Sequence, residues 1–96
     1  MFKKFENPFK LRNKGVIFVL DAEVVGRVIQ RIREQRRRSQ ELVSGLAGIG
    51  RTHLSAIERG QRRPTMETFF KIAEALNMRP SALMAEIEEE MEKCGK

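Results

Sequence analysis

Residues 39–60 read SQELVSGLAGIGRTHLSAIERG, and this segment is the most informative part of the 96-residue chain. Ser39 is a suitable N-cap for a helix, because its hydroxyl can accept a hydrogen bond from a free backbone N–H in the first turn. The apolar positions of that helix are Leu42, Val43, Leu46 and Ala47. Gly48 is a natural left-handed stop, so the helix is expected to end in a tight turn.

A second helix is predicted directly after the turn, over residues 51–59, and Gly60 ends it. Its spacing turns Leu54 and Ile57 inward. Two short helices joined by a turn of about three residues that contains glycine form a helix-turn-helix. In this motif the second helix lies in the major groove of DNA, so the segment predicts a DNA-binding module.

Upstream of the motif, the sequence predicts one further helix and an extension. Asp21 is a plausible N-cap, and the helix is expected to end near residues 36–38. Its apolar stripe has helical spacing and consists of Val25, Val28, Ile29 and Ile32. Residues 1–20 form a basic and apolar extension, whose β-prone run 16–20 predicts a short strand.

Downstream of the motif, two more helices are predicted. Thr65 caps the first of them, Asn77 is a left-handed stop, and Pro80 prevents its continuation. The apolar face of this helix is wide and consists of Met66, Phe69, Phe70, Ile72, Ala73 and Leu76. The last helix is expected to begin after Ser81 and to run through the acidic stretch 86–92.

These elements predict an all-α fold, a compact five-helix bundle with the helix-turn-helix in its second and third helices. We divide the chain into an N-terminal extension (1–20), a DNA-binding domain (21–85) and an acidic C-terminal helix extension (86–96). The β-strand, if formed, belongs to the extension.

The charge of the chain is uneven. Residues 21–64 contain ten Arg and no Lys against five acidic residues, and residues 65–96 contain seven acidic residues against four basic ones. Arginine suits planar, bidentate contacts to phosphate and guanine. The net charge of +6 and this asymmetry favour an anionic partner.

Several function classes are not expected. One His, one Cys and no grouping of His, Cys, Asp or Glu at metal-ligand spacing predict no metal, no cofactor and no enzyme. No apolar run approaches the ~20 residues that a membrane span needs. A single cysteine makes no internal disulfide, so we expect a cytoplasmic protein.

From Val25 to about Leu83 the sequence resembles the lambda repressor/Cro-like, or XRE-type, helix-turn-helix regulators. The resemblance rests on SQE, IERG and KIAEAL, which stand at the family's spacing without gaps. It implies a buried ion pair between Arg33 and Glu58, which would tie the first helix to the recognition helix. Arg38 departs from the pattern, because an apolar residue is common there.

The resemblance also implies the residues that meet DNA. Gln40 would touch a phosphate and brace the recognition helix, whereas Arg51 and Thr52 occupy base-reading positions. Arginine can span guanine O6 and N7, and Thr52 or Ala56 could meet a thymine methyl. The residues expected at phosphate or at the groove edge are His53, Ser55, Arg59, Arg62 and Arg63.

Family members commonly dimerise through their fourth and fifth helices. The resemblance therefore implies dimerisation candidates in this chain, which are Phe69, Phe70, Met78, Leu83 and Met84. For Phe69 and Phe70 an internal core role is an equal alternative. The extension, with three Phe and the run 16–20, is expected to pack near an exposed stripe of Leu42 and Leu46 or across a dimer; the alternative is a disordered basic arm.

The sequence thus predicts a homodimeric transcription regulator with residues 51–59 in the major groove of an inverted repeat. A dimer would place its two recognition helices about 34 Å apart on one face of the duplex. Two alternatives stay open: an antitoxin, or a restriction-modification controller, that binds DNA and autoregulates its operon.

Overall fold

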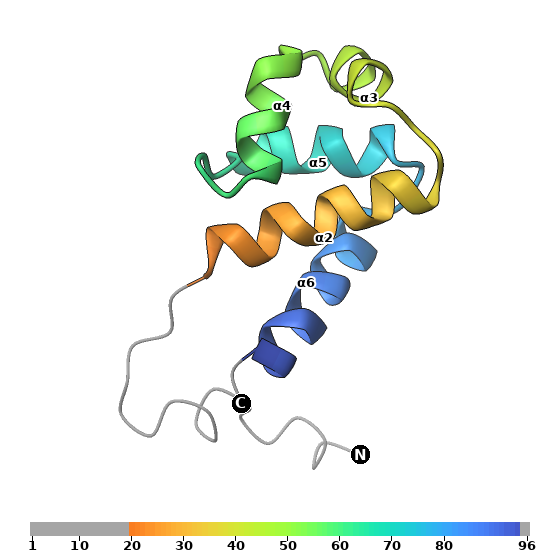
Figure 1. Cartoon of the computed structure of the whole chain (residues 1–96). Helices are drawn as coiled ribbons and strands as arrows, with labels where there is room; N and C mark the ends of the chain where they lie inside the picture. The colour runs from red at the N-terminus through yellow and green to blue at the C-terminus, as the bar shows by residue number, and fades with distance from the viewer. Residues whose placement is uncertain (1–19, 95–96) are drawn as a thin grey trace.

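The computed structural model describes residues 20–94, and five helices make up this part of the chain. They are α2 (Ala22–Gln35), α3 (Gln40–Ala47), α4 (Arg51–Glu58), α5 (Met66–Ala75) and α6 (Pro80–Cys94) (Figure 1). The prediction of an all-α fold with five helices is confirmed. The predicted strand, apart from Leu20, lies outside the described residues.

Three helices begin at side-chain caps that the sequence predicted. The Asp21 carboxylate accepts a hydrogen bond from the Glu23 N–H at 2.9 Å. The Ser39 hydroxyl accepts from the Leu42 N–H at 3.0 Å, and Thr65 accepts from the Thr68 N–H at 3.1 Å. Each cap satisfies one of the backbone donors that a helix leaves free in its first turn.

Four of the five helices in residues 20–94 are followed by a left-handed residue, as expected at three positions. Gly60 follows α4 with φ 78°. Gly48 follows α3 with φ 72°, and Asn77 follows the end of α5 with φ 61°. The sequence did not reveal that Arg37, after α2, is also left-handed, with φ 56°. Its N–H donates to the Glu34 carbonyl, and the Arg38 N–H donates to the Arg33 carbonyl, so the turn closes α2 despite the cost of a side chain there.

α6 begins earlier than predicted, because Pro80 is its first residue and not a residue before its start. A proline fits the first helical position, where its missing N–H costs no hydrogen bond. The helix continues without a break across positions 85 and 86, and Ile87 belongs to the core. Arg31 in α2 pairs with Glu86 at 2.9 Å and with Glu90 at 3.3 Å. The acidic stretch therefore packs as part of the same domain.

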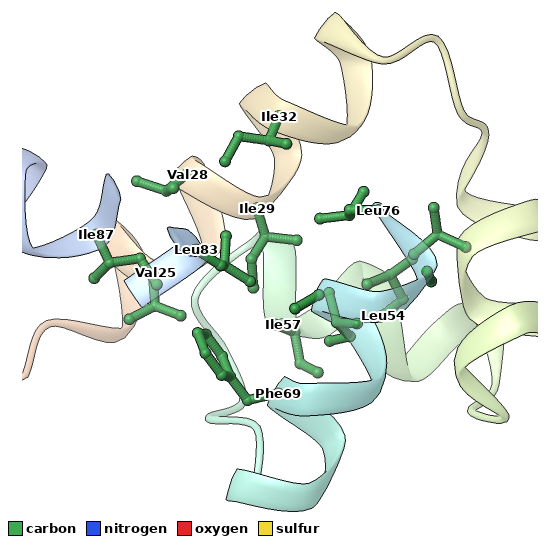
Figure 2. Close-up of a cluster of buried hydrophobic side chains, with 14 of the residues drawn as sticks. Val25, Val28, Ile29, Ile32, Leu54, Ile57, Phe69, Leu76, Leu83 and Ile87 are labelled. Atoms are coloured by element: carbon green, nitrogen blue, oxygen red, sulfur yellow. The ribbon is translucent and has the colours of Figure 1, made fainter. Parts of the chain in front are cut away.

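The core lies around α2, with α4 on one side and α6 on the other (Figures 1 and 2). The predicted stripe of α2 is buried, together with Leu54 and Ile57 of α4 and Leu76 of α5. On α3 only half of the predicted apolar positions are buried: Val43 and Ala47 face the core, whereas Leu42 and Leu46 are exposed. Each fully buried Val, Leu or Ile contributes roughly 1.5–3 kcal/mol relative to exposure.

α2 and α4 cross so closely that only a glycine fits at the contact. A Cβ at Gly26 would lie 2.2 Å from the Ile57 carbonyl oxygen and 2.6 Å from that of Glu58. Because both are backbone atoms, neither can move aside without moving α4. Gly26 thus sets the distance between the first helix and the recognition helix, a role that sequence reasoning missed.

Candidate nucleic-acid interface

The turn between α3 and α4 consists of the three residues 48–50, as the sequence predicted. Gly48 is left-handed, and the Ile49 N–H donates to the Ser44 carbonyl at 3.0 Å. Gly50 is the N-cap of α4 and offers no side chain to the helix. The exposed first turn of α4 therefore presents backbone N–H groups, which carry the partial positive charge of a helix N-terminus.

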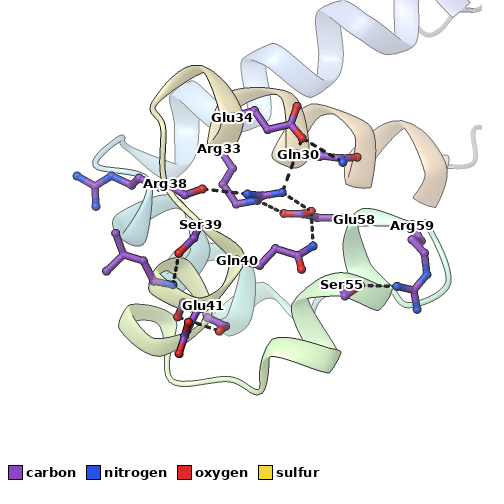
Figure 3. A network of polar contacts seen from close by, with 12 residues as sticks. Gln30, Arg33, Glu34, Arg38, Ser39, Gln40, Glu41, Ser55, Glu58 and Arg59 are labelled. Carbon is purple, nitrogen blue, oxygen red and sulfur yellow. Dashed lines mark hydrogen bonds and ion pairs between the residues drawn. The ribbon is translucent and has the colours of Figure 1, made fainter.

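A buried ion pair holds α4 against α2 (Figure 3). Arg33 Nε lies 2.6 Å from Glu58 Oε2, and Nη2 donates to Oε1 at 3.1 Å, so the contact is bidentate. Arg33 is 9% exposed and Glu58 5%. The hydrogen bond to Glu58 raises the pKa of Arg33 from its ordinary value, so the guanidinium stays charged. A raised pKa contributes stability that is lost only as the pH rises through that pKa. The contribution of Arg33 to the stability of the fold is therefore constant near neutrality.

Gln40, the first residue of α3, joins the same carboxylate. Its Nε2 donates to Glu58 Oε1 at 2.8 Å, and it is half-buried. Arg33 also donates from Nη1 to the Arg38 carbonyl at 2.9 Å, which fixes the link between α2 and α3. One carboxylate thus ties three helices together at the back of α4. The structure shows the bracing contact of Gln40; a contact to phosphate stays a prediction.

The opposite face of α4 is open. Arg51, Thr52 and Arg59 are exposed, whereas His53 and Ser55 are half-buried. Ala56 differs from our expectation, because it is only 9% exposed. A thymine methyl contact at this position is therefore not supported, and Thr52 is left as the small apolar contact.

The remaining arginines of the region have different neighbours. Arg59 donates to Ser55 Oγ one turn earlier and to Gln61 Oε1 at 3.1 Å, so its side chain lies along the end of α4. Arg62 is exposed in the following loop. Arg63 donates to the Leu20 carbonyl at 2.5 Å, so its guanidinium is held at the start of the described chain.

Two arginines cap the C-terminal end of α5, a contact that sequence reasoning did not predict. Arg36 donates to the carbonyls of Leu76 and Asn77, at 3.0 and 3.3 Å. Arg38 donates to the Ala75 carbonyl at 3.0 Å, which explains its departure from the apolar pattern. Cations at the last carbonyls of a helix are stabilising. Local patterns in the sequence carry no signal for these contacts, because they join positions 37 to 41 residues apart.

The dimerisation candidates separate into two groups. Phe70 and Met84 are exposed, and Met78 is half-buried at the edge of the core. Phe69 and Leu83 are buried within the monomer, Leu83 completely, because α5 and α6 pack them against α2 (Figure 2). Leu83 is therefore a core residue, and Phe69 takes the core role that was its alternative while it keeps a small exposed part.

Two negative findings concern residues 20–94. This part of the chain has no group of three or more His, Cys, Asp or Glu side chains that could hold a metal ion. Nor does it contain a helix that is long and apolar enough to cross a membrane.

Comparison with known proteins agrees with this geometry. Residues 29–83 match the family model described as helix-turn-helix. The chain is 36% identical over 56 residues to the HTH-type transcriptional regulator y4dJ of Sinorhizobium fredii (strain NBRC 101917 / NGR234). The matched region is 58% of this chain and 73% of that protein.

Two solved structures extend the comparison to the fold. The restriction-modification controller protein C.AhdI from Aeromonas hydrophila is 31% identical, with a TM-score of 0.64, over 68% of this chain and 98% of that one. The controller protein C.Esp1396I, solved as a tetramer in complex with its natural 35 base-pair operator, is 25% identical. Its TM-score is 0.69, over 76% of this chain and 96% of that one.

Proposed function

The chain belongs to the helix-turn-helix family, and on that premise we propose that it binds double-stranded DNA sequence-specifically as a homodimeric transcription regulator. One observation carries the proposal: α4 presents Arg51 and Thr52 to solvent while a buried bidentate ion pair fixes its other face to α2. A helix that reads bases must be held rigidly, because base contacts depend on register in the groove.

The base-reading roles belong to the first turn of α4. Arg51 is the residue we assign to guanine, where a bidentate contact to O6 and N7 is worth roughly 1–3 kcal/mol of discrimination. Thr52 is placed to meet a thymine methyl or a base edge. Both side chains are exposed at the end of α4 that enters the groove first.

Phosphate contacts surround that turn in the proposal. They fix the orientation of the protein on the duplex but carry no sequence information. The residues assigned to them are Gln40, His53, Ser55, Arg59, Arg62 and Arg63. Arg59 and Arg63 would have to exchange their present intramolecular partners for phosphate, so Arg62 is the simplest phosphate ligand of the loop.

A homodimer follows from the small size of the module, since one recognition helix reads too few base pairs for a unique site. The proposed contacts between the two copies are exposed Phe70 and Met84, together with half-buried Met78. Two-fold symmetry would then place the recognition helices about 34 Å apart, on an inverted repeat. The same proposal assigns the protein to the cytoplasm and gives it no catalytic role.

A second candidate is the narrower role of a restriction-modification controller. It is favoured by the likeness to C.AhdI, which this chain matches over 98% of that protein's length. Both candidates use the same DNA-binding face, so they differ in the genes that the operator controls.

The test is binding of the full chain to a short duplex from its own upstream region and to a scrambled duplex of equal length, over a series of salt concentrations. We expect the upstream duplex to bind at least 10³-fold more tightly, the lower end of typical specific-to-nonspecific ratios. Sedimentation of the complex should give two chains per duplex. Equal affinity for both duplexes at every salt concentration would contradict the proposal, because nonspecific attraction alone explains that result.

A further inference from the structure

An apolar groove of about 400 Å³ lies between the start of α2, the loop before α5, and the first turns of α5 and α6. Arg63 is the one lining residue that it shares with the DNA-binding face described above. Its walls include Val25, Phe69 and Ile87, and its rim includes Met66 and Phe70. Of the six large hydrophobic side chains that are exposed in residues 20–94, four line this groove: Leu20, Met66, Phe70 and Met84. Met66 is 79% exposed. This concentration of exposed apolar surface calls for an occupant.

We infer that residues 16–19 of the same chain occupy this groove. The four residues read Val-Ile-Phe-Val, and they directly precede Leu20, which itself lines the groove. The longest uninterrupted apolar run of the sequence, residues 16–20, therefore ends at a residue that lines this apolar groove. No part of this inference depends on the proposed function.

Arg63 supports the direction in which the chain arrives. Its Nη1 donates to the Leu20 carbonyl at 2.5 Å, and its side chain also lines the groove. A charge-assisted hydrogen bond to this carbonyl fixes the backbone immediately after the proposed segment. Leu20 is thus held at the groove that it lines, and residues 16–19 directly precede it in the sequence.

The reach of the segment excludes the other exposed apolar stripe. Fully extended, residues 16–19 span at most about 14 Å from Leu20. α2 has 14 residues and is therefore about 21 Å long, and α3 with Leu42 and Leu46 follows its far end (Figure 1). The run cannot lie on that stripe, which was one of the two sites expected from the sequence. In a homodimer formed through this face, residues 16–19 of each copy would occupy the groove of their own chain.

The chain contains no Trp and no Tyr, so a single tryptophan reports on the segment without background. In full-length Phe18→Trp, we expect emission shifted to shorter wavelength and protected from acrylamide, compared with the same protein in urea. The shift should be the same at nanomolar and at micromolar protein. Adding Met66→Glu or Phe70→Glu should expose the tryptophan, because a carboxylate at the rim disfavours an apolar occupant. Leu46→Glu is the matched control and should change nothing, because Leu46 on α3 is 59% exposed, between Phe70 at 53% and Met66 at 79%.

Met66 and Phe70 are exposed, so both groove variants should keep the helical circular dichroism of Phe18→Trp. Two sites are used so that the test remains valid if one variant does not fold. Two results would overturn the inference. One is that Phe18→Trp emits like a tryptophan exposed to water, and the other is that the short-wavelength shift persists in both groove variants. A shift that disappears on dilution would also overturn it, since a second copy would then be the occupant.

Discussion

Leu54, Ile57 and Glu58 on the inner face of α4 are buried against the rest of the domain, while Arg51, Thr52 and Arg59 on its outer face are exposed. The inner face is fixed by apolar packing, by a glycine contact and by a bidentate ion pair. Within the described residues, the outer face makes local contacts, such as those of Arg59 with Ser55 and Gln61. The difference teaches that stability and recognition reside in different side chains of one eight-residue helix, so substitutions should separate them.

The largest effect is expected on the inner face, from Glu58→Ala. It removes the acceptor of both Arg33 and Gln40 and leaves the buried guanidinium without its buried carboxylate, with only the exposed Glu34 at 3.9 Å as a charged partner. The free energy of unfolding should fall by about 3–5 kcal/mol, measured by urea denaturation followed by circular dichroism. Glu34→Ala is the control, because Glu34 pairs with the same arginine at 3.9 Å but is exposed. That exposed pair should be worth about 0–1 kcal/mol. Equal costs for the two variants would contradict a structural role of the buried pair.

The second effect concerns the distance between α2 and α4. Gly26→Ala places a methyl group against backbone carbonyls of α4, so we expect a loss of at least about 1–3 kcal/mol in unfolding free energy. Gly45→Ala is the matched control inside a helix. A Cβ there meets nothing within 4 Å, so this change should stabilise the protein by about 0.5–1 kcal/mol. If both glycines tolerated alanine equally, α2 and α4 would not be in the close contact described here.

The smallest effect is expected beyond the outer face, from Arg62→Ala in the loop. Its side chain is exposed, so unfolding free energy should not change by more than about 0.5 kcal/mol. If Arg62 binds phosphate, affinity should fall by the same factor on every duplex, and the slope of log affinity against log salt should decrease by about 1. Titrations of upstream and scrambled duplexes at four salt concentrations measure both quantities. A selective loss on the upstream duplex would instead make Arg62 a base reader.

The elements that sequence reasoning predicted correctly are those with local causes. Ser39, Thr65, Gly48 and Asn77 act within one or two turns of their own helices, so their roles follow from residue type and position. Gly26 depends on the approach of a helix thirty residues away. A glycine inside an apolar helical stripe is the available signal for such a contact, and here it was not used.

Helical periodicity predicted which apolar residues share one face of a helix, but not which part of the molecule covers that face. Leu83 was a candidate for a dimer contact and Ala56 for a DNA contact, although both are buried within the monomer, and Phe69 takes the core role that was its equal alternative. Conversely, Leu42 and Leu46 belong to the apolar pattern and are exposed. Arg36 and Arg38 show the same limit for charge, because the α5 carbonyls that they cap become neighbours only in the folded chain.

The central claim is that the outer face of α4 reads DNA while its inner face maintains the fold, and Arg51→Ala tests it most directly. The measurement is the ratio of affinities for the upstream and scrambled duplexes, taken together with the urea midpoint of the same preparation. We predict that the variant keeps the midpoint of the parent and loses about 1–3 kcal/mol of discrimination. An unchanged affinity ratio at an unchanged midpoint would contradict the claim, because a folded protein would then recognise its site without the residue that this face presents first.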